Sequence, residues 1–241
     1  MTTLTKIIVT TLFSILLLSC NFDVNFGSIN GTGNVISVER GLSEPFTTIK
    51  TSSGLDVYLT QDDDISLTVE ADENLHDIII TEVKNGTLTI TASENIGRAD
   101  SKKIRLTLND ISRIKTTSGS DVYSTNTITT ENLELETTSG SDMKLSVNTT
   151  TLNCKSTSGS DLKLSGKTIK LIAEATSGSD IKAADLIAES SQVKATSGAD
   201  ITVNTSKELT AKATSGGDIK YLGNPEVVNK SDSSAGSIKK Q

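Results

Sequence analysis

Aromatic residues are scarce in this chain of 241 residues, where they make up 3% of the composition, and tryptophan is absent. So few large side chains cannot fill the wide core of an ordinary globular domain. Intrinsic disorder is one interpretation of such a composition, but disorder does not produce regularly spaced Val, Ile and Leu. The composition therefore favours a thin core of small residues that is repeated many times along the chain.

Positive charge is also in deficit. The chain has 23 Lys and Arg residues against 30 Asp and Glu residues, and its formal net charge is −7. A nucleic acid requires a basic surface that neutralises its phosphates, so this charge argues against a nucleic-acid partner. The same charge opposes electrostatic docking on a membrane of anionic lipids.

The N-terminus has the pattern of an export signal. Residues 7–18 form an apolar stretch of about a dozen residues, which is well below the roughly 20 needed to span a bilayer. The stretch leads into Leu-Leu-Ser-Cys, ending at Cys20, which resembles the lipobox of bacterial lipoproteins. We therefore expect a lipoprotein signal peptide at residues 1–19, lipidation of Cys20, and a tether at residues 20–30. An ordinary signal peptide with an incidental cysteine is the alternative.

This anchor predicts a location in the cell envelope. The lipid on Cys20 would make the membrane a partner, and the protein would be an outer-membrane lipoprotein that faces the periplasm or the cell exterior. The chain has one other cysteine, Cys154, which a lipidated Cys20 leaves without a partner. A structural disulfide is therefore not expected even in an oxidising compartment.

The second half of the chain contains an internal repeat. Thr-Ser-Gly-Ser-Asp occurs four times, and Thr-Ser-Gly-Ala-Asp and Thr-Ser-Gly-Gly-Asp follow once each. The glycines of these six copies lie 21, 19, 19, 20 and 18 residues apart, at Gly119, Gly140, Gly159, Gly178, Gly198 and Gly216. An earlier, looser copy ends at Asp56, and a degenerate last copy begins at Ser233. Six close matches at one period indicate a repeat architecture.

Around each glycine, apolar and polar residues alternate with a period of two, which is typical of β-strands. Each repeat is therefore predicted to be a strand, a tight turn at Ser-Gly, and a second strand, with one face inward and one outward. Cys154 takes a position that Ile, Leu, Ala or Val occupies in the other repeats, so we interpret it as a small buried hydrophobe. One coil buries too few side chains to be stable alone, whereas stacked coils share a continuous core. The repeat thus predicts an all-β protein built as a β-solenoid.

The solenoid repeats are expected at residues 111–222. Residues 31–110 are less regular and predict longer strands, with a hairpin at Asn85-Gly86, that form an irregular β cap on the N-terminal end. Residues 223–241 are interpreted as a degenerate C-terminal cap or tail, whose Lys230, Lys239 and Lys240 would protect the other end.

Several segments carry a resemblance to a known family. They include Gly-Thr-Gly-Asn-Val at residues 31–35, Ser-Gly-Leu-Asp-Val-Tyr-Leu-Thr-Gln at 53–61, Glu-Val-Lys-Asn-Gly-Thr-Leu at 82–88, and the Ser-Gly-Ser-Asp repeats. In order and spacing the chain resembles the head GIN domain family of Gram-negative envelope lipoproteins, described as autotransporter adhesin head domains, over about residues 27–222. The resemblance implies a single-stranded, right-handed parallel β-helix and an adhesin role in which the surface binds a glycan or protein at the cell surface. It implies no catalytic residues.

The aspartates of the repeat form the candidate functional feature. Each lies two residues after its glycine on the outward face, so stacking predicts a surface ladder of Asp121, Asp142, Asp161, Asp180, Asp200 and Asp218. We favour a solvated structural ladder, because neighbouring lysines offset a repulsion of only about 1 kcal/mol in water. Calcium binding by a structural envelope protein is an alternative, but calcium requires six to eight oxygens, and one aspartate per coil supplies few. We expect no metal site and no cofactor.

A polysaccharide-processing enzyme is the second alternative, because stacked carboxylates would approach the roughly 5–5.5 Å separation of a retaining glycosidase. An active site normally breaks a repeat, however, whereas this aspartate recurs unchanged. The single histidine, His76, lies outside the repeats, and the sequence contains no nucleophile or metal motif. We therefore predict a non-catalytic interaction module, and we expect Tyr58, Tyr123 and Tyr221 to be exposed contacts on its surface.

Overall fold

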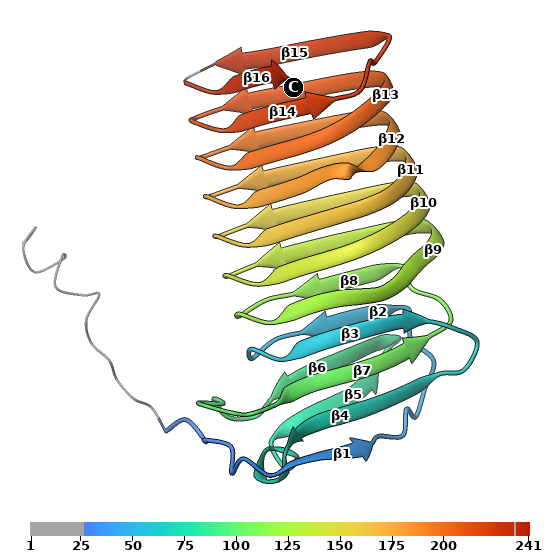
Figure 1. Ribbon diagram of the computed structural model, residues 1–241, viewed down its shortest axis with the longest axis vertical. Helices are drawn as coiled ribbons and strands as arrows, with labels where there is room; N and C mark the ends of the chain where they lie inside the picture. Colours follow the sequence, from blue (N-terminus) through green and yellow to red (C-terminus); the bar gives the residue numbers. More distant parts are fainter. Residues whose placement is uncertain (1–26, 234) are drawn as a thin grey trace, which may run out of the picture.

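The computed structural model describes residues 27–233 and 235–241, and it shows an upright stack of flattened coils (Figure 1). The predicted signal peptide, Cys20 and most of the tether lie outside the described residues. Within the described part the fold is all-β, with a single 3-10 turn at Glu73–Leu75, and no helix there is long and apolar enough to cross a membrane. The strands nearer the viewer in Figure 1 run from left to right as the chain climbs, so the coil is right-handed. The predicted fold class is confirmed.

Five long strands form the central coils. Each begins at a repeat aspartate, bends around one narrow side of the solenoid, and ends at the threonine before the next Ser-Gly turn: β9 (Asp121–Thr138), β10 (Asp142–Thr157), β11 (Asp161–Thr176), β12 (Asp180–Thr196) and β13 (Asp200–Thr214). We call the side with the Ser-Gly turns the turn edge and the side where the strands bend the rounded edge. Neighbouring coils pair in parallel with equivalent residues opposite each other, as for Asp142 and Asp161.

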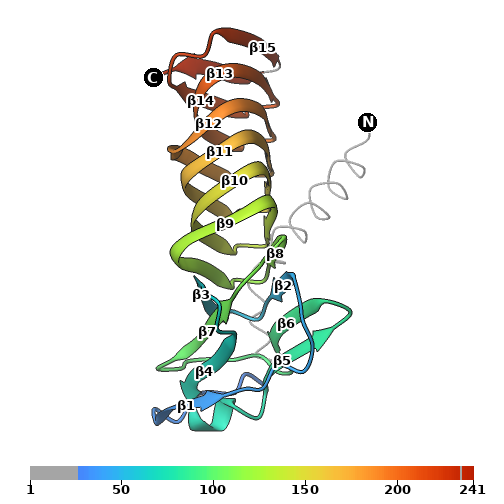
Figure 2. The ribbon, with the colours of Figure 1, turned by 90° about the vertical axis from the view of Figure 1, so that its right-hand side faces the viewer.

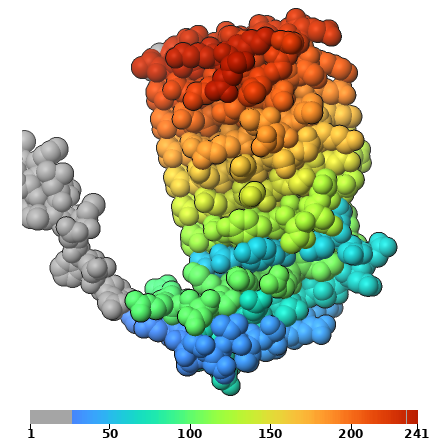
Figure 3. Space-filling view, in the orientation of Figure 1, coloured from blue at the N-terminus to red at the C-terminus, as the bar shows by residue number. Residues whose placement is uncertain are grey.

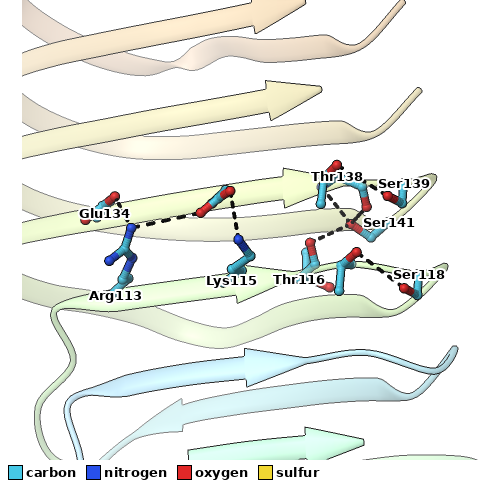
Figure 4. A network of polar contacts seen from close by, with 10 residues as sticks. Arg113, Lys115, Thr116, Ser118, Glu134, Thr138, Ser139 and Ser141 are labelled. Atoms are coloured by element: carbon cyan, nitrogen blue, oxygen red, sulfur yellow. Dashed lines mark hydrogen bonds and ion pairs between the residues drawn. The ribbon is translucent and has the colours of Figure 1, made fainter. Parts of the chain in front are cut away.

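The Ser-Gly turns are tight because both central residues have positive φ, for example 57° at Ser118 and 68° at Gly119. This combination is that of a type I′ turn. The serine after the glycine is buried and holds successive turns together. The Ser141 hydroxyl lies 2.8 Å from the carbonyl oxygen of Thr138 and 3.0 Å from that of Thr116 in the preceding coil (Figure 4). The second serine of the repeat is thus a structural residue of the interior.

The core is a narrow column of apolar side chains between the two flat faces. Alternation places Val122, Met143 and Leu162 inward on one face, and all are at most 1% exposed. On the other face Cys154 lies opposite Leu135 and Ala173 in the neighbouring coils and is 5% exposed. The prediction that Cys154 is a buried hydrophobe is therefore correct, and its burial raises the pKa of the thiol.

The N-terminal part has an order that differs from the sequence. Its strands are β1 (Val35–Glu39), β2 (Thr48–Thr51), β3 (Asp56–Gln61), β4 (Ser66–Asp72), β5 (Ile79–Lys84), β6 (Thr87–Ala92), β7 (Lys102–Leu108) and β8 (Arg113–Thr116). The coil of β2 and β3 lies between the coil of β6 and β7 and the coil that begins with β8 (Figure 2). The parallel stack therefore starts within the segment expected to be only a cap.

Antiparallel pairs close this end of the solenoid. β5 and β6 form the predicted hairpin, with φ of 51° at Asn85 and 71° at Gly86, and β4 pairs with both β1 and β7. The buried Asp72 carboxylate accepts hydrogen bonds from the backbone N–H groups of Ser101, Gly33 and Asp100, which hold its pKa below the usual range. This carboxylate ties the first described residues to the cap.

The C-terminal end of the stack consists of β14 (Asp218–Leu222), β15 (Val227–Ser233) and β16 (Ser237–Lys240), and β16 pairs in parallel with β14. In β15, Lys230 and Asp232 lie opposite the buried Ala211 and Ala213 of β13, so charged residues occupy inward register positions in the last coil. Inward charges are a common protection of exposed strand edges. The degenerate last repeat is thus a coil of the solenoid whose end is protected by charge.

Candidate binding surfaces

The predicted aspartate ladder is present on one flat face. Register places the six aspartates in one row, and Asp56 of β3 extends the row beyond Asp121. Sequence reasoning recognised the copy of the motif that ends at Asp56 but did not place this residue in the ladder. In the space-filling view of this face, the coils follow one another as level bands (Figure 3).

The ladder carboxylates are engaged in holding the strands. Asp121 Oδ1 accepts the backbone N–H of Asp142 at 3.2 Å, and Asp142 Oδ1 accepts that of Asp161 at 3.1 Å. The Lys182 ammonium lies 2.6 Å from a carboxylate oxygen of Asp161 and 3.2 Å from one of Asp180. Within residues 27–233 and 235–241, no three acidic, His or Cys side chains are grouped as metal ligands. The ladder has the contacts of a structural element.

Burial and mutual repulsion act on the ladder carboxylates. Burial is the largest cause that raises the pKa of Asp142 above 3.8, and the charges of Asp121 and Asp161 raise it further. The same two causes raise the pKa of Asp56 and Asp200. Ionisation of these groups is therefore less favourable in the folded protein than in the unfolded chain.

Asp142→Asn is expected to stabilise the protein by less than about 1 kcal/mol at neutral pH, because it removes a like charge while its amide oxygen still accepts the Asp161 N–H. Since the folded pKa is raised, the carboxylate lowers stability as the pH rises from 3.8 through the folded value, and it costs nothing at lower pH. Urea unfolding of both proteins at neutral and acidic pH measures this. A gain that persists in acid would contradict the charge explanation.

Two tyrosines on the same face stack on each other. The ring centroids of Tyr58 and Tyr123 are 5.2 Å apart with an interplanar angle of 24°, and the Arg105 guanidinium lies 5.8 Å from the Tyr58 centroid. The Tyr123 hydroxyl donates to Asp121 at 3.0 Å, and burial together with this carboxylate raises the pKa of Tyr123 to about 12. Because Arg105 and Tyr123 cover its two sides, Tyr58 presents mainly its edge to a ligand.

Tyr221 does not have the predicted exposure. It is 6% exposed, since alternation along β14 puts it inward beside Ile219, opposite the buried Val203. The Lys230 ammonium lies 4.6 Å from the ring centroid and covers it. The expectation of an exposed contact at Tyr221 is therefore wrong. His76, in the cap, is half-buried, with Nε2 3.2 Å and 3.3 Å from the carbonyl oxygens of Ala71 and Ile36.

A groove of about 580 Å³ lies on the rounded edge. Its walls are two outward rows that run along the solenoid axis, namely Thr129, Asn148, Lys167 and Ile187, and Glu131, Thr150, Ile169 and Glu189. Between them, Thr130, Thr149 and Thr168 form the floor. Ile169 and Ile187 are 50% and 57% exposed, which is unusual for large apolar side chains in this protein.

Sequence reasoning missed this groove. Two features of the sequence indicate an irregularity here. Gly178 and Gly198 are 20 residues apart, one more than the two preceding spacings, and Gly166 interrupts a segment in which apolar and polar residues otherwise alternate. In the structure the pairing of β12 shifts between Ala183 and Ile187, and Gly166 has φ of 105°. The repeat is regular on the turn edge and is interrupted on the rounded edge.

The sequence matches the family described as "Putative auto-transporter adhesin, head GIN domain" over residues 45–225. The chain belongs to the head GIN domain family. This head GIN domain is similar to the crystal structure of a putative adhesin from Bacteroides fragilis, with a TM-score of 0.82 and 24% identity over 89% of this chain and 100% of that one. A comparison with curated proteins gave no match.

Two further crystal structures share the fold of this head GIN domain. A putative lipid binding protein from Parabacteroides distasonis has a TM-score of 0.71 and 22% identity, over 89% of this chain and 100% of that one. A putative adhesin from the same organism has a TM-score of 0.73 and 20% identity, with the same coverage. The family points to an adhesin-like protein of the cell surface or envelope.

Proposed function

We propose that this head GIN domain is a non-catalytic binding module that a lipid on Cys20 anchors in the outer membrane. The regular aspartate ladder supports a non-catalytic role, because the carboxylates of Asp121 and Asp142 accept backbone N–H groups and the aspartate recurs in every coil from Asp121 to Asp218. An enzyme needs a small set of residues that differs from its surroundings. The lipobox-like segment that ends at Cys20 supports the anchor.

The solenoid suits an extended interaction because its outward residues form straight rows along the axis. Repeat proteins commonly use such rows as long binding surfaces. The rows of this protein combine hydroxyl groups, both signs of charge and few exposed aromatic rings. We propose a glycan or a protein on a cell surface as the ligand.

Replacement of Cys20 by alanine is expected to release the protein from the membrane fraction, because a single unlipidated chain has no other anchor in this proposal. Cell fractionation and metabolic labelling with a fatty acid measure the loss, with Cys154→Ala as the matched control. Proteolysis of intact cells then separates exposure on the outer surface from a periplasmic orientation. An unlabelled wild-type protein would contradict the anchor.

The binding role is measured by applying the purified chain to arrays of glycans and matrix proteins. Absence of binding across both arrays would contradict it. The same chain is also incubated with polysaccharides, and the release of reducing ends is measured. If the wild type releases reducing ends and the double variant Asp142→Asn, Asp161→Asn does not, the protein is an enzyme.

A further inference from the structure

The rounded-edge groove is the place where the solenoid departs from its own repeat. On the flat face, register pairs aspartate with aspartate from Asp121 to Asp218. On the rounded edge, the equivalent residues change from Thr129 to Asn148 to Lys167 to Ile187. A site that selects one ligand requires such local differences, because an unbroken row offers the same contacts at every coil.

The walls and the floor of the groove have different roles. The floor hydroxyls of Thr149 and Thr168 are buried and bonded to each other at 2.9 Å, so they belong to the protein's own framework. The wall residues Thr129, Thr150 and Ile169 are exposed, and so is Ile187. A ligand in the groove would therefore meet hydroxyl groups and branched aliphatic surface together.

Strand pairing occupies the backbone of one wall and of the floor of the groove. The backbone from Asn148 to Thr149 pairs with β9 on one side and with β11 on the other, and Lys167 to Thr168 pairs with β10 and β12. An extended peptide that binds by adding a strand requires free backbone N–H and C=O groups. In the other wall, the carbonyl oxygens of Thr150 and Ile169 accept the hydroxyl groups of Thr168 and Ser190. The groove therefore offers a ligand mainly its side chains, which suits the hydroxyl and C–H surface of a sugar chain.

The charges of the groove nearly cancel. Lys167 and Glu131 have opposite signs, and Glu189 forms an ion pair with Lys207. An anionic or cationic polymer would find no excess of the opposite charge. A neutral ligand matches this balance.

We infer that the rounded-edge groove binds a stretch of a neutral, unbranched polysaccharide whose chain runs along the solenoid axis. Ile169 and Ile187 contact the C–H surface of the sugar rings. The hydroxyl groups of Thr129 and Thr150 and the amide of Asn148 form hydrogen bonds with the sugar hydroxyls. This inference rests on the proposed binding function and names its ligand class and its site.

The test uses the full chain in detergent and soluble polysaccharides as probes: a β-glucan, a mannan and a xylan as neutral chains, and polygalacturonate as a charged one. We expect binding to at least one neutral chain, and little change in affinity up to about 1 M NaCl, where charge interactions are screened within about 3 Å. Preference for polygalacturonate, or strong weakening by salt, would overturn the inference.

Ile169→Ser and Ile187→Ser are each expected to weaken binding by about tenfold. Thr150→Arg, which fills the groove from an exposed position, should weaken it at least as much. Ile80→Ser is the matched control, because Ile80 is 39% exposed on β5 of the cap and lies outside the groove. Thermal unfolding of each variant confirms that the fold is retained.

Other results separate the two proposals. If these three substitutions leave polysaccharide binding unchanged, the groove is not the binding site, although the proposed binding function still holds. If the wild type captures gelatin or phosphatidylcholine vesicles and the groove variants do not, the groove is a binding site but its ligand is not a polysaccharide. Binding to none of these probes or array components would overturn both.

Discussion

Replacement of Gly166 by alanine is expected to lower the free energy of unfolding by about 3 kcal/mol or more. Gly166 lies in β11 with φ of 105°, which L side chains rarely adopt. A Cβ atom there would lie 2.1 Å from the carbonyl oxygen of Val147 in the preceding coil. Since that oxygen belongs to the backbone of a paired strand, it cannot move away without breaking the stack. Urea unfolding followed by circular dichroism measures the loss.

Gly140→Ala is the matched control on the turn edge. Gly140 also has positive φ, at 66°, but a Cβ atom there meets nothing within 4 Å. Its substitution should cost only the strain of a left-handed residue, about 1–2 kcal/mol. The neighbouring Ser139 already adopts φ of 58°, which shows that this edge tolerates a side chain in that conformation. Equal losses in the two variants would contradict a steric cause at Gly166.

The turn edge was predictable because each of its features depends on neighbours in sequence. The Thr-Ser-Gly-Ser-Asp motif fixes a type I′ turn, and alternation then decides which side chains face inward. The same rule applied to β14 puts Tyr221 inward, so its burial follows from counting positions from Ile219. The expectation of an exposed contact at Tyr221 is inconsistent with this position in the alternation.

The order of the N-terminal coils was not predictable from spacing. β2 and β3 precede β6 and β7 in the chain, yet they lie between them and β8 in the stack. β2 pairs with β6 on one side and with β8 on the other, and its local sequence does not indicate which two strands will be its neighbours. The groove escaped prediction for a related reason, because its walls combine residues from four coils that share no motif.

The double substitution Lys230→Val, Asp232→Val is expected to make the chain associate end to end. β15 pairs with β13 along one edge, and among the described residues no strand pairs with its other edge. Lys230 and Asp232 continue the inward rows of Ala211 and Ala213, so valines there would extend the apolar core to an open end. Each valine that a second copy buries would contribute about 1.5 kcal/mol or more.

Sedimentation velocity over a range of protein concentrations measures this association, which should appear at micromolar concentration in the double variant and be absent in the wild type. The matched control is Glu174→Val, Lys194→Val, which also removes one ion of each sign but from a salt bridge on a flat face. There the strands are paired on both sides, so two added valines offer no backbone edge to a second copy. Association of the control to the same extent would show that apolar surface alone causes it. If the double variant does not associate, the inward charges of β15 are not what prevents a second copy from pairing with this strand.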